Sequence, residues 1–186
     1  MKKIAIVYHS GYGHTKKQAE AVVAGVNSVA GVEAVLYTTA EAEHKFEELK
    51  AVDGIIFGSP VYMGSLSADF KKFMELSSKS WYVRDWSGKV AAGFVNSASL
   101  NGDKQTAMIQ LVTFAAQHGM LWSSLNLLPS NSSKAKPDDL NRMGASLGAY
   151  ATSDSDLGPD LVPTKGDLDT ASHLGKQTAE TVLRLK

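Results

Sequence analysis

The stretch that decides the fold is residues 4–15, which read Ile-Ala-Ile-Val-Tyr-His-Ser-Gly-Tyr-Gly-His-Thr. Its first five residues are continuously apolar, which is typical of a parallel strand covered on both faces. A glycine-containing turn then leads into residues 19–26, where alanine and valine recur at the i, i+3, i+4, i+7 spacing of one helix face. The stretch therefore predicts a strand, a tight turn and a helix, in that order.

The same alternation continues to the end of the chain. Further apolar strands are expected at 34–37, 54–57, 90–95 and 120–122, and helices at 41–50, 67–74, 108–115 and 167–186. This order predicts a single α/β domain over residues 1–186, with a five-stranded parallel sheet in the doubly wound order 2-1-3-4-5 and helices on both faces. Residues of about 129–165 are rich in Ser, Asn, Asp, Gly and Pro and predict an irregular insertion.

Composition excludes several classes of function. The 186 residues carry 19 basic and 19 acidic side chains, so no charge excess points to nucleic acid or to an acidic membrane surface. The absence of cysteine excludes disulfides, thiolate nucleophiles and iron–sulfur clusters. No segment approaches the ~20 apolar residues of a membrane span, and the first apolar run is too short for a signal peptide. We expect a cytoplasmic protein that binds neither nucleic acid nor membrane.

Ligands of doubly wound sheets bind beyond the carboxyl ends of the strands, so the loops after strands one, three and four are the candidates. The first loop has small residues and leads directly into a helix, whose amide N–H groups and dipole attract an anion. It predicts a phosphate cradle, with a plain strand-to-helix turn as the alternative. Its residues are Ser10, Gly11, Tyr12, Gly13, His14 and Thr15.

Two better-known phosphate motifs do not fit this loop. The Walker pattern fails because no Gly-Lys-Ser/Thr follows, and the dinucleotide fingerprint fails because Lys16 occupies its third glycine position. No acidic residue ends the second strand, where Tyr37 is followed by Thr38 and Thr39. The loop therefore favours a mononucleotide over NAD as the tightly bound ligand.

The loops after strands three and four, residues 59–65 and 96–102, are small and polar. Their backbone groups can hydrogen-bond the edge of a heteroaromatic ring, while Tyr62 and Met63 offer apolar contact. Each loop alone is ordinary turn chemistry, and only their shared position at one sheet edge makes them notable.

The sequence resembles the flavodoxin-like FMN proteins, most closely the tryptophan-repressor-binding-protein type of NAD(P)H:quinone oxidoreductase. The resemblance lies in the loop 10–14, in residues 58–66, and in Gln117-His118-Gly119-Met120. It implies a three-layer αβα sandwich and one non-covalent FMN, with the phosphate on residues 10–15. The implied ring contacts are Pro60, Val61, Tyr62, Met63, Gly64, Ser97, Ala98, Ser99, Leu100, Asn101 and Gly102.

The resemblance also implies an activity. FMN would take electrons from NAD(P)H and pass them to a quinone or similar small acceptor, in a dimer or tetramer. Trp81 would line the acceptor pocket of a neighbouring subunit, and His118 would have a polar or proton role near the flavin. The alternatives are a flavodoxin-type electron carrier without a substrate of its own, and an interaction scaffold with an empty site.

Other residues carry weaker signals. His118 could instead cap the end of its helix as a cation. Among the five histidines no metal-ligand spacing occurs, so we expect no metal site. Residues 144–148 match the Gly-x-Ser-x-Gly pattern of hydrolases, with His173 downstream, but that motif needs a strand before it and a helix after it.

Overall fold

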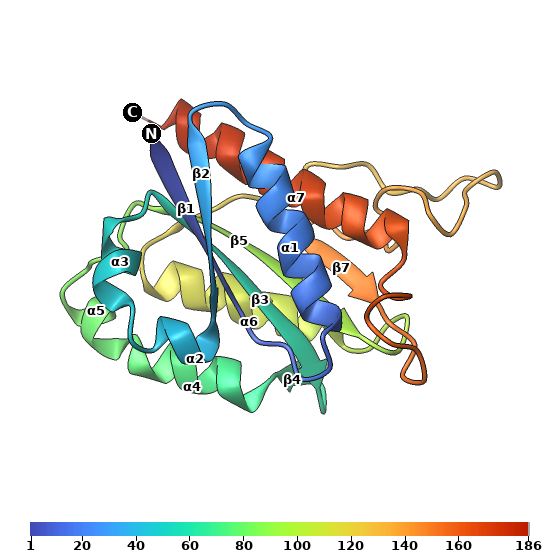
Figure 1. Ribbon diagram of the computed structural model, residues 1–186, viewed down its shortest axis with the longest axis horizontal. Helices are drawn as coiled ribbons and strands as arrows, with labels where there is room; N and C mark the ends of the chain where they lie inside the picture. The colour runs from blue at the N-terminus through green and yellow to red at the C-terminus, as the bar shows by residue number, and fades with distance from the viewer. Residues whose placement is uncertain (186) are drawn as a thin grey trace.

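The computed structural model describes residues 1–185 and consists of one sheet with helices on both faces (Figure 1). Its strands and helices, in chain order, are β1 (Lys2–Tyr8), α1 (His14–Asn27), β2 (Val32–Thr38), α2 (Thr39–Ala42), α3 (Phe46–Ala51), β3 (Gly54–Tyr62), β4 (Ser65–Leu66), α4 (Ala68–Leu76), α5 (Ser78–Tyr82), β5 (Val90–Ser97), α6 (Lys104–Gln117), β6 (Leu121–Trp122), β7 (Ala149–Thr152) and α7 (Lys165–Arg184).

The sheet confirms the predicted topology. Its main path is β2-β1-β3-β5-β6, which is the order 2-1-3-4-5 for the five predicted strands, and all of these pairs are parallel. The fifth position is shared by two strands. β6 pairs with the amino half of β5, and β7 pairs with its carboxyl half through Phe94↔Ala149 to Ser97↔Thr152.

Alternate residues of the central strands face opposite layers, as a pleated strand requires. Ile4, Ile6 and Ile56 pack toward α1 and α7, whereas Ala5, Val7 and Phe57 pack toward the layer of α3, α4 and α6. Both faces are therefore apolar, which explains why these strands read as continuous hydrophobic runs.

α1 and α7 lie side by side on one face of the sheet (Figure 1). Two glycines allow their backbones to approach. A Cβ on Gly25 would lie 1.8 Å from the carbonyl oxygen of Ser172, and a Cβ on Gly175 would lie 2.2 Å from that of Val22. This close contact fixes the position of α1, whose first turn carries the predicted phosphate loop.

Three expectations need correction. The third strand does not end at Phe57 but runs to Tyr62, because β5 pairs with it as far as Pro60↔Asn96. The helix expected at 41–50 is two short helices, since Thr38 and Glu41 form a capping box that starts a separate first turn. The segment 129–165, expected to be an irregular insertion with an extended stretch near 147–152, contains the short strand β7 within that stretch and joins it to the sheet.

Within residues 1–185 the longest helix, α7, is too polar to cross a bilayer, and the shorter helices do not qualify either.

Candidate functional site

A cavity of about 660 Å³ lies at the carboxyl ends of β1, β3 and β5. It brings together the loops predicted after the first, third and fourth strands, together with a fourth segment, residues 153–159, that the sequence did not single out. Its lining residues are Ser10, Gly11, Tyr12, His14, Thr15, Pro60, Val61, Tyr62, Asn96, Ser97, Ala98, Ser153, Ser155, Asp156, Leu157, Gly158 and Pro159.

The first loop is held open by Ser10. Its Oγ accepts hydrogen bonds from the amides of Gly13 (3.1 Å) and Lys16 (3.2 Å). Gly13 precedes the helix in a left-handed conformation, with φ +92°, that few residues other than glycine adopt. The amides of Tyr12, His14 and Thr15 have no acceptor within residues 1–185. The loop therefore offers unpaired donors at the positive end of α1, which is the arrangement that binds phosphate.

Residues 153–160 form the outer wall of this loop. The His14 ring nitrogen Nε2 lies 2.9 Å from the carbonyl oxygen of Leu157, and Lys17 forms an ion pair of 3.0 Å with Asp160. Pro159 lies over Gly13, since its Cγ is 2.9 Å from the position of a Cβ on that glycine. Only turn-forming composition marks this wall in the sequence, because its contacts are with residues more than 140 positions away.

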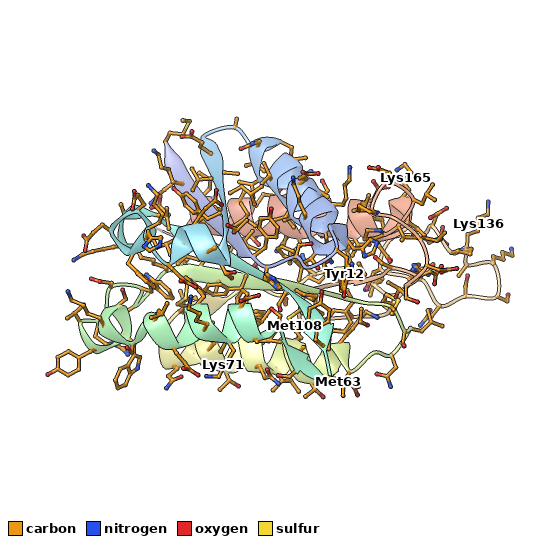
Figure 2. All side chains as sticks on the ribbon, turned by 60° about the horizontal axis from the view of Figure 1, so that its bottom comes forward. Tyr12, Met63, Lys71, Met108, Lys136 and Lys165 are labelled. Carbon is orange, nitrogen blue, oxygen red and sulfur yellow. The ribbon has the colours of Figure 1, made fainter. Side chains whose placement is uncertain are left out.

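A second cavity, of about 490 Å³, adjoins the first and shares Val61, Ser97 and Ala98 with it. It is completed by Ser99, Gly102 and Asp103 and by the two-residue turn between β3 and β4. Met63, in that turn, has φ 49° and is fully exposed, and Figure 2 shows it at the outer edge of the molecule. Of the predicted residues, Gly13, Leu100 and Asn101 belong to the loops but line neither cavity.

Tyr62 lies across the entrance to the phosphate loop. Its hydroxyl oxygen is 2.5 Å from the position of a Cβ on Gly11, and its ring meets that of Tyr12 edge-on, with centroids 6.5 Å apart. Partial burial raises the pKa of Tyr62, so the hydroxyl is protonated at neutral pH. Two aromatic rings thus stand at the mouth of the larger cavity.

The charges of the site are unusual for an anion-binding site. Neither cavity has a lysine or arginine in its lining, and the carboxylates there are Asp103 and Asp156. The lysines next to the loop pair with acids instead, Lys17 with Asp160 and Lys16 with Glu20. Any phosphate bound here is therefore held by backbone amides, hydroxyls and the helix dipole.

The structure does not bring His118 to these cavities. It ends α6, next to β6, which pairs with the amino end of β5 and so lies at the opposite edge of the sheet. Its side chain is buried, with the ring stacked on Trp86 at a centroid distance of 4.2 Å and Nε2 2.9 Å from the Ser77 Oγ. Since the Ser77 hydroxyl donates to the Met74 carbonyl, Nε2–H is the donor to Ser77.

His118 is therefore neutral. Burial, with a smaller contribution from the Arg84 charge, lowers its pKa to about 4. His118 is the C-cap residue of α6, but its ring bonds Ser77 and carries no charge, so the predicted cationic cap is not formed. Trp81 lies on α5 at the same distant edge and is partly exposed (Figure 1). The role of Trp81 at a neighbouring subunit's site and the polar or proton role of His118 near a flavin stay predictions.

The hydrolase pattern lacks its structural context. Residues 144–148 are preceded by turns rather than a strand and are followed by β7 rather than a helix. Within residues 1–185 no three His, Asp or Glu side chains gather in a way that could hold a metal ion.

Comparison with known proteins identifies the family. The family model described as NADPH-dependent FMN reductase matches residues 14–128, more than half of the chain. The chain belongs to the NADPH-dependent FMN reductase family. It is 45% identical over 91% of both chains to "Flavodoxin FldP" of Pseudomonas aeruginosa, and 30% identical over the full length of both to an "NAD(P)H dehydrogenase (quinone)" of Archaeoglobus fulgidus. A WrbA-like flavodoxin from Agrobacterium tumefaciens has a similar structure, with TM-score 0.78, 37% identity and full coverage of both chains.

The chain is thus an oxidoreductase with the flavodoxin-like fold, and its cofactor is FMN. The site fits this cofactor. The unpaired amides of Tyr12, His14 and Thr15 suit a phosphate group, and the second cavity beside the β3–β4 turn suits a flat ring. The same loop excludes a bulky residue at Gly13, where a Cβ would meet Pro159.

We expect Gly13→Asp to weaken FMN binding at least about 100-fold, equivalent to ~3 kcal/mol. The new side chain would be strained at φ +92°, would meet Pro159 and would place a carboxylate beside the phosphate. Binding is measured by quenching of FMN fluorescence. Gly31→Asp is the matched control, because Gly31 has φ +88° with only a Leu183 methyl within 4 Å and lies away from the site. Equal losses of FMN affinity in the two variants would contradict the assignment of residues 10–15 as the phosphate loop.

His118 predicts a pH dependence of stability. Its folded pKa lies below its ordinary value, so the unfolded chain binds more protons between about pH 6.5 and pH 4. Stability from this group is complete above pH 6.5 and is lost as the pH falls toward 4, by on the order of 3 kcal/mol. The free energy of unfolding in urea should not show this loss in His118→Asn. The control His44→Asn, at an exposed histidine, should show it as the wild type does. If the free energy of unfolding falls with pH in the same way in the wild type and in His118→Asn, the His118 ring is not held neutral.

Proposed function

We propose that this protein takes electrons from NAD(P)H onto FMN and passes them to a quinone or a similar small acceptor. The observation that carries the proposal is the pair of adjoining cavities, of about 660 and 490 Å³, at the edge of the sheet. Each is in the size range of a small-molecule site, so a flat donor or acceptor has room beside the flavin ring. Relatives named NAD(P)H dehydrogenase (quinone) support this activity.

In this proposal the chain positions the reactants and FMN supplies the hydride and electron transfer. The amides of residues 12–15 hold the phosphate, with Ser10 keeping the loop in shape. The ring lies between residues 60–64 and 97–102, where Met63 and Gly64 form one edge of the second cavity. The entrance near Tyr12 and Tyr62 receives the donor and then the acceptor.

The second candidate is an electron carrier that exchanges electrons with a partner protein. The relative at 45% identity is named a flavodoxin. The lining of the site also favours the carrier, since it has carboxylates but no lysine or arginine, and an acidic surface attracts a basic redox partner. The neutral net charge of the whole chain favours the reductase.

Anaerobic stopped-flow absorbance separates the two functions. FMN-loaded protein is mixed with NADH or NADPH, and then with a soluble quinone. We expect one of the nucleotides to bleach the oxidised flavin and the quinone to restore its absorbance within a single turnover. Free FMN at the same concentration is the control for reduction in solution.

Absence of bleaching by either nucleotide, together with rapid reduction by a flavodoxin reductase, would overturn the reductase and support the carrier. Bleaching no faster than with free FMN would also count against the reductase.

A further inference from the structure

Lys104, the first residue of α6, is a buried lysine behind the loop 97–103. Only 1% of it is exposed, and its Nζ donates to the carbonyl oxygens of Ser99 (2.5 Å) and Leu100 (3.1 Å) and to the Thr152 Oγ1 (3.3 Å). All three ammonium protons thus have acceptors, and none of these acceptors is a carboxylate. The charge also lies at the positive end of a helix, where the dipole disfavours it.

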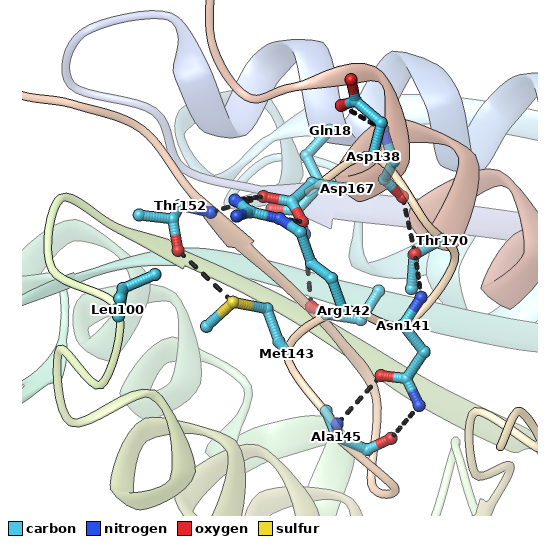
Figure 3. Close-up of polar contacts among 12 residues, drawn as sticks. Gln18, Leu100, Asp138, Asn141, Arg142, Met143, Ala145, Thr152, Asp167 and Thr170 are labelled. Carbon is cyan, nitrogen blue, oxygen red and sulfur yellow. Dashed lines mark hydrogen bonds and ion pairs between the residues drawn. The ribbon is translucent and has the colours of Figure 1, made fainter. Parts of the chain in front are cut away.

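The nearest carboxylate is already neutralised. Asp167, on α7, accepts two hydrogen bonds of 2.8 Å from the guanidinium of Arg142 and a third from the Thr152 amide (Figure 3). Thr152 links the two groups, since its amide binds Asp167 and its hydroxyl binds Lys104. Asp138 and Asp154 also act on the Arg142 charge. Lys104, in contrast, has no carboxylate among its hydrogen-bond partners and so lacks a bonded counter-charge.

The Asp103 carboxylate does not supply this counter-charge. It lies across the second cavity, with Oδ2 3.8 Å from the position of a Cβ on Gly64 in the β3–β4 turn. Burial, opposed by Asp167 and reinforced by Arg142, lowers the pKa of Lys104 to about 8. Lys104 therefore carries its charge at neutral pH and loses it in mildly alkaline solution.

The contacts of Lys104 also set the direction of the loop amides. In a trans peptide the carbonyl and the following N–H point in opposite directions. Because the carbonyls of Ser99 and Leu100 point to Lys104, the N–H groups of Leu100 and Asn101 point away from it. Neither N–H has an acceptor within the described chain, so both are free to bind a ligand.

We infer that Lys104 is a positioning residue for the flavin: it turns the Leu100 and Asn101 amides away from itself, at the rim of the second cavity that their neighbours Ser99 and Gly102 line, and it places behind them a positive charge that no carboxylate bonds directly. Reduced flavin carries negative charge on its pyrimidine edge near neutral pH, so donors and a cation near that edge favour the reduced form. The inference rests on the proposed position of the ring beside residues 97–102. It makes Lys104 a determinant of the reduction potential.

The test compares the midpoint potentials of FMN-loaded variants, measured anaerobically with dithionite and redox dyes, so that no nicotinamide is needed. Lys104→Met keeps an apolar side chain of similar length but removes the charge and the donors. We expect it to weaken binding of reduced FMN at least about tenfold more than binding of oxidised FMN, which lowers the two-electron potential by about 30 mV. Lys104→Arg, which keeps the charge and the donors, should have a midpoint potential close to that of the wild type.

Lys89→Met is the matched control. Lys89 is also partly buried, and its Nζ donates to the carbonyls of Lys50 (2.8 Å) and Val52 (2.6 Å), but at the opposite edge of the sheet. Its loss should lower stability without changing the potential. The difference in potential between wild type and Lys104→Met should shrink as the pH rises above 8, because wild-type Lys104 then loses the charge that Lys104→Met lacks at every pH.

An unchanged ratio of oxidised to reduced FMN affinity in Lys104→Met would overturn the inference, as would an equal shift in Lys89→Met. If Lys104→Met does not fold, the inference is tested by hydrogen exchange of residues 98–103 in the wild type with and without FMN. FMN should slow exchange of the Leu100 and Asn101 amides. Absence of protection would overturn the inference. If Lys104→Met lowers the midpoint potential but NAD(P)H does not reduce the wild type, the role of Lys104 is supported and NAD(P)H is refuted as the donor. If the wild type does not bind FMN, both the inference and the proposed function are overturned.

Discussion

The constraint on which the site depends is the unpaired backbone at the start of α1. A helix leaves its first amides without partners, and here they open at the edge where β1, β3 and β5 end. The position of α1 is fixed by its close contact with α7 through Gly25 and Gly175. The sheet order then brings the β3–β4 turn and the loop 97–103 to the same edge, so the proposed phosphate cradle and the proposed ring cavity are neighbours as a consequence of topology.

The lining of both cavities holds no lysine or arginine, so a phosphate in the proposed cradle would be held by backbone amides through geometry rather than by net charge. The carboxylates of Asp103 and Asp156 are part of that lining. Lys104 is buried behind the loop 97–103 and acts through the carbonyls of Ser99 and Leu100 and through its positive charge. The reduction potential of a cofactor whose charge changes on reduction depends on such nearby charges.

Local sequence predicted much of this. The apolar runs gave the strands and their order, and residues 10–15 predicted the turn because its chemistry is contained in consecutive residues. The outer wall at 153–159 was missed, since it meets the first loop only through tertiary contacts such as that of Leu157 with His14. Lys104 was missed because nothing local distinguishes a buried lysine, and the site of His118 was missed because motif resemblance does not specify which edge of the sheet, or which subunit, a residue serves.

The most direct measurement is amide NMR of the apoprotein titrated in turn with FMN and with riboflavin, which lacks the phosphate. We expect the Tyr12, His14 and Thr15 amides to shift strongly with FMN and hardly at all with riboflavin, while residues 97–103 shift with both. Equal shifts of the first loop with the two ligands, or no shift of its amides with FMN, would contradict the claim that backbone donors at the start of α1 hold the phosphate.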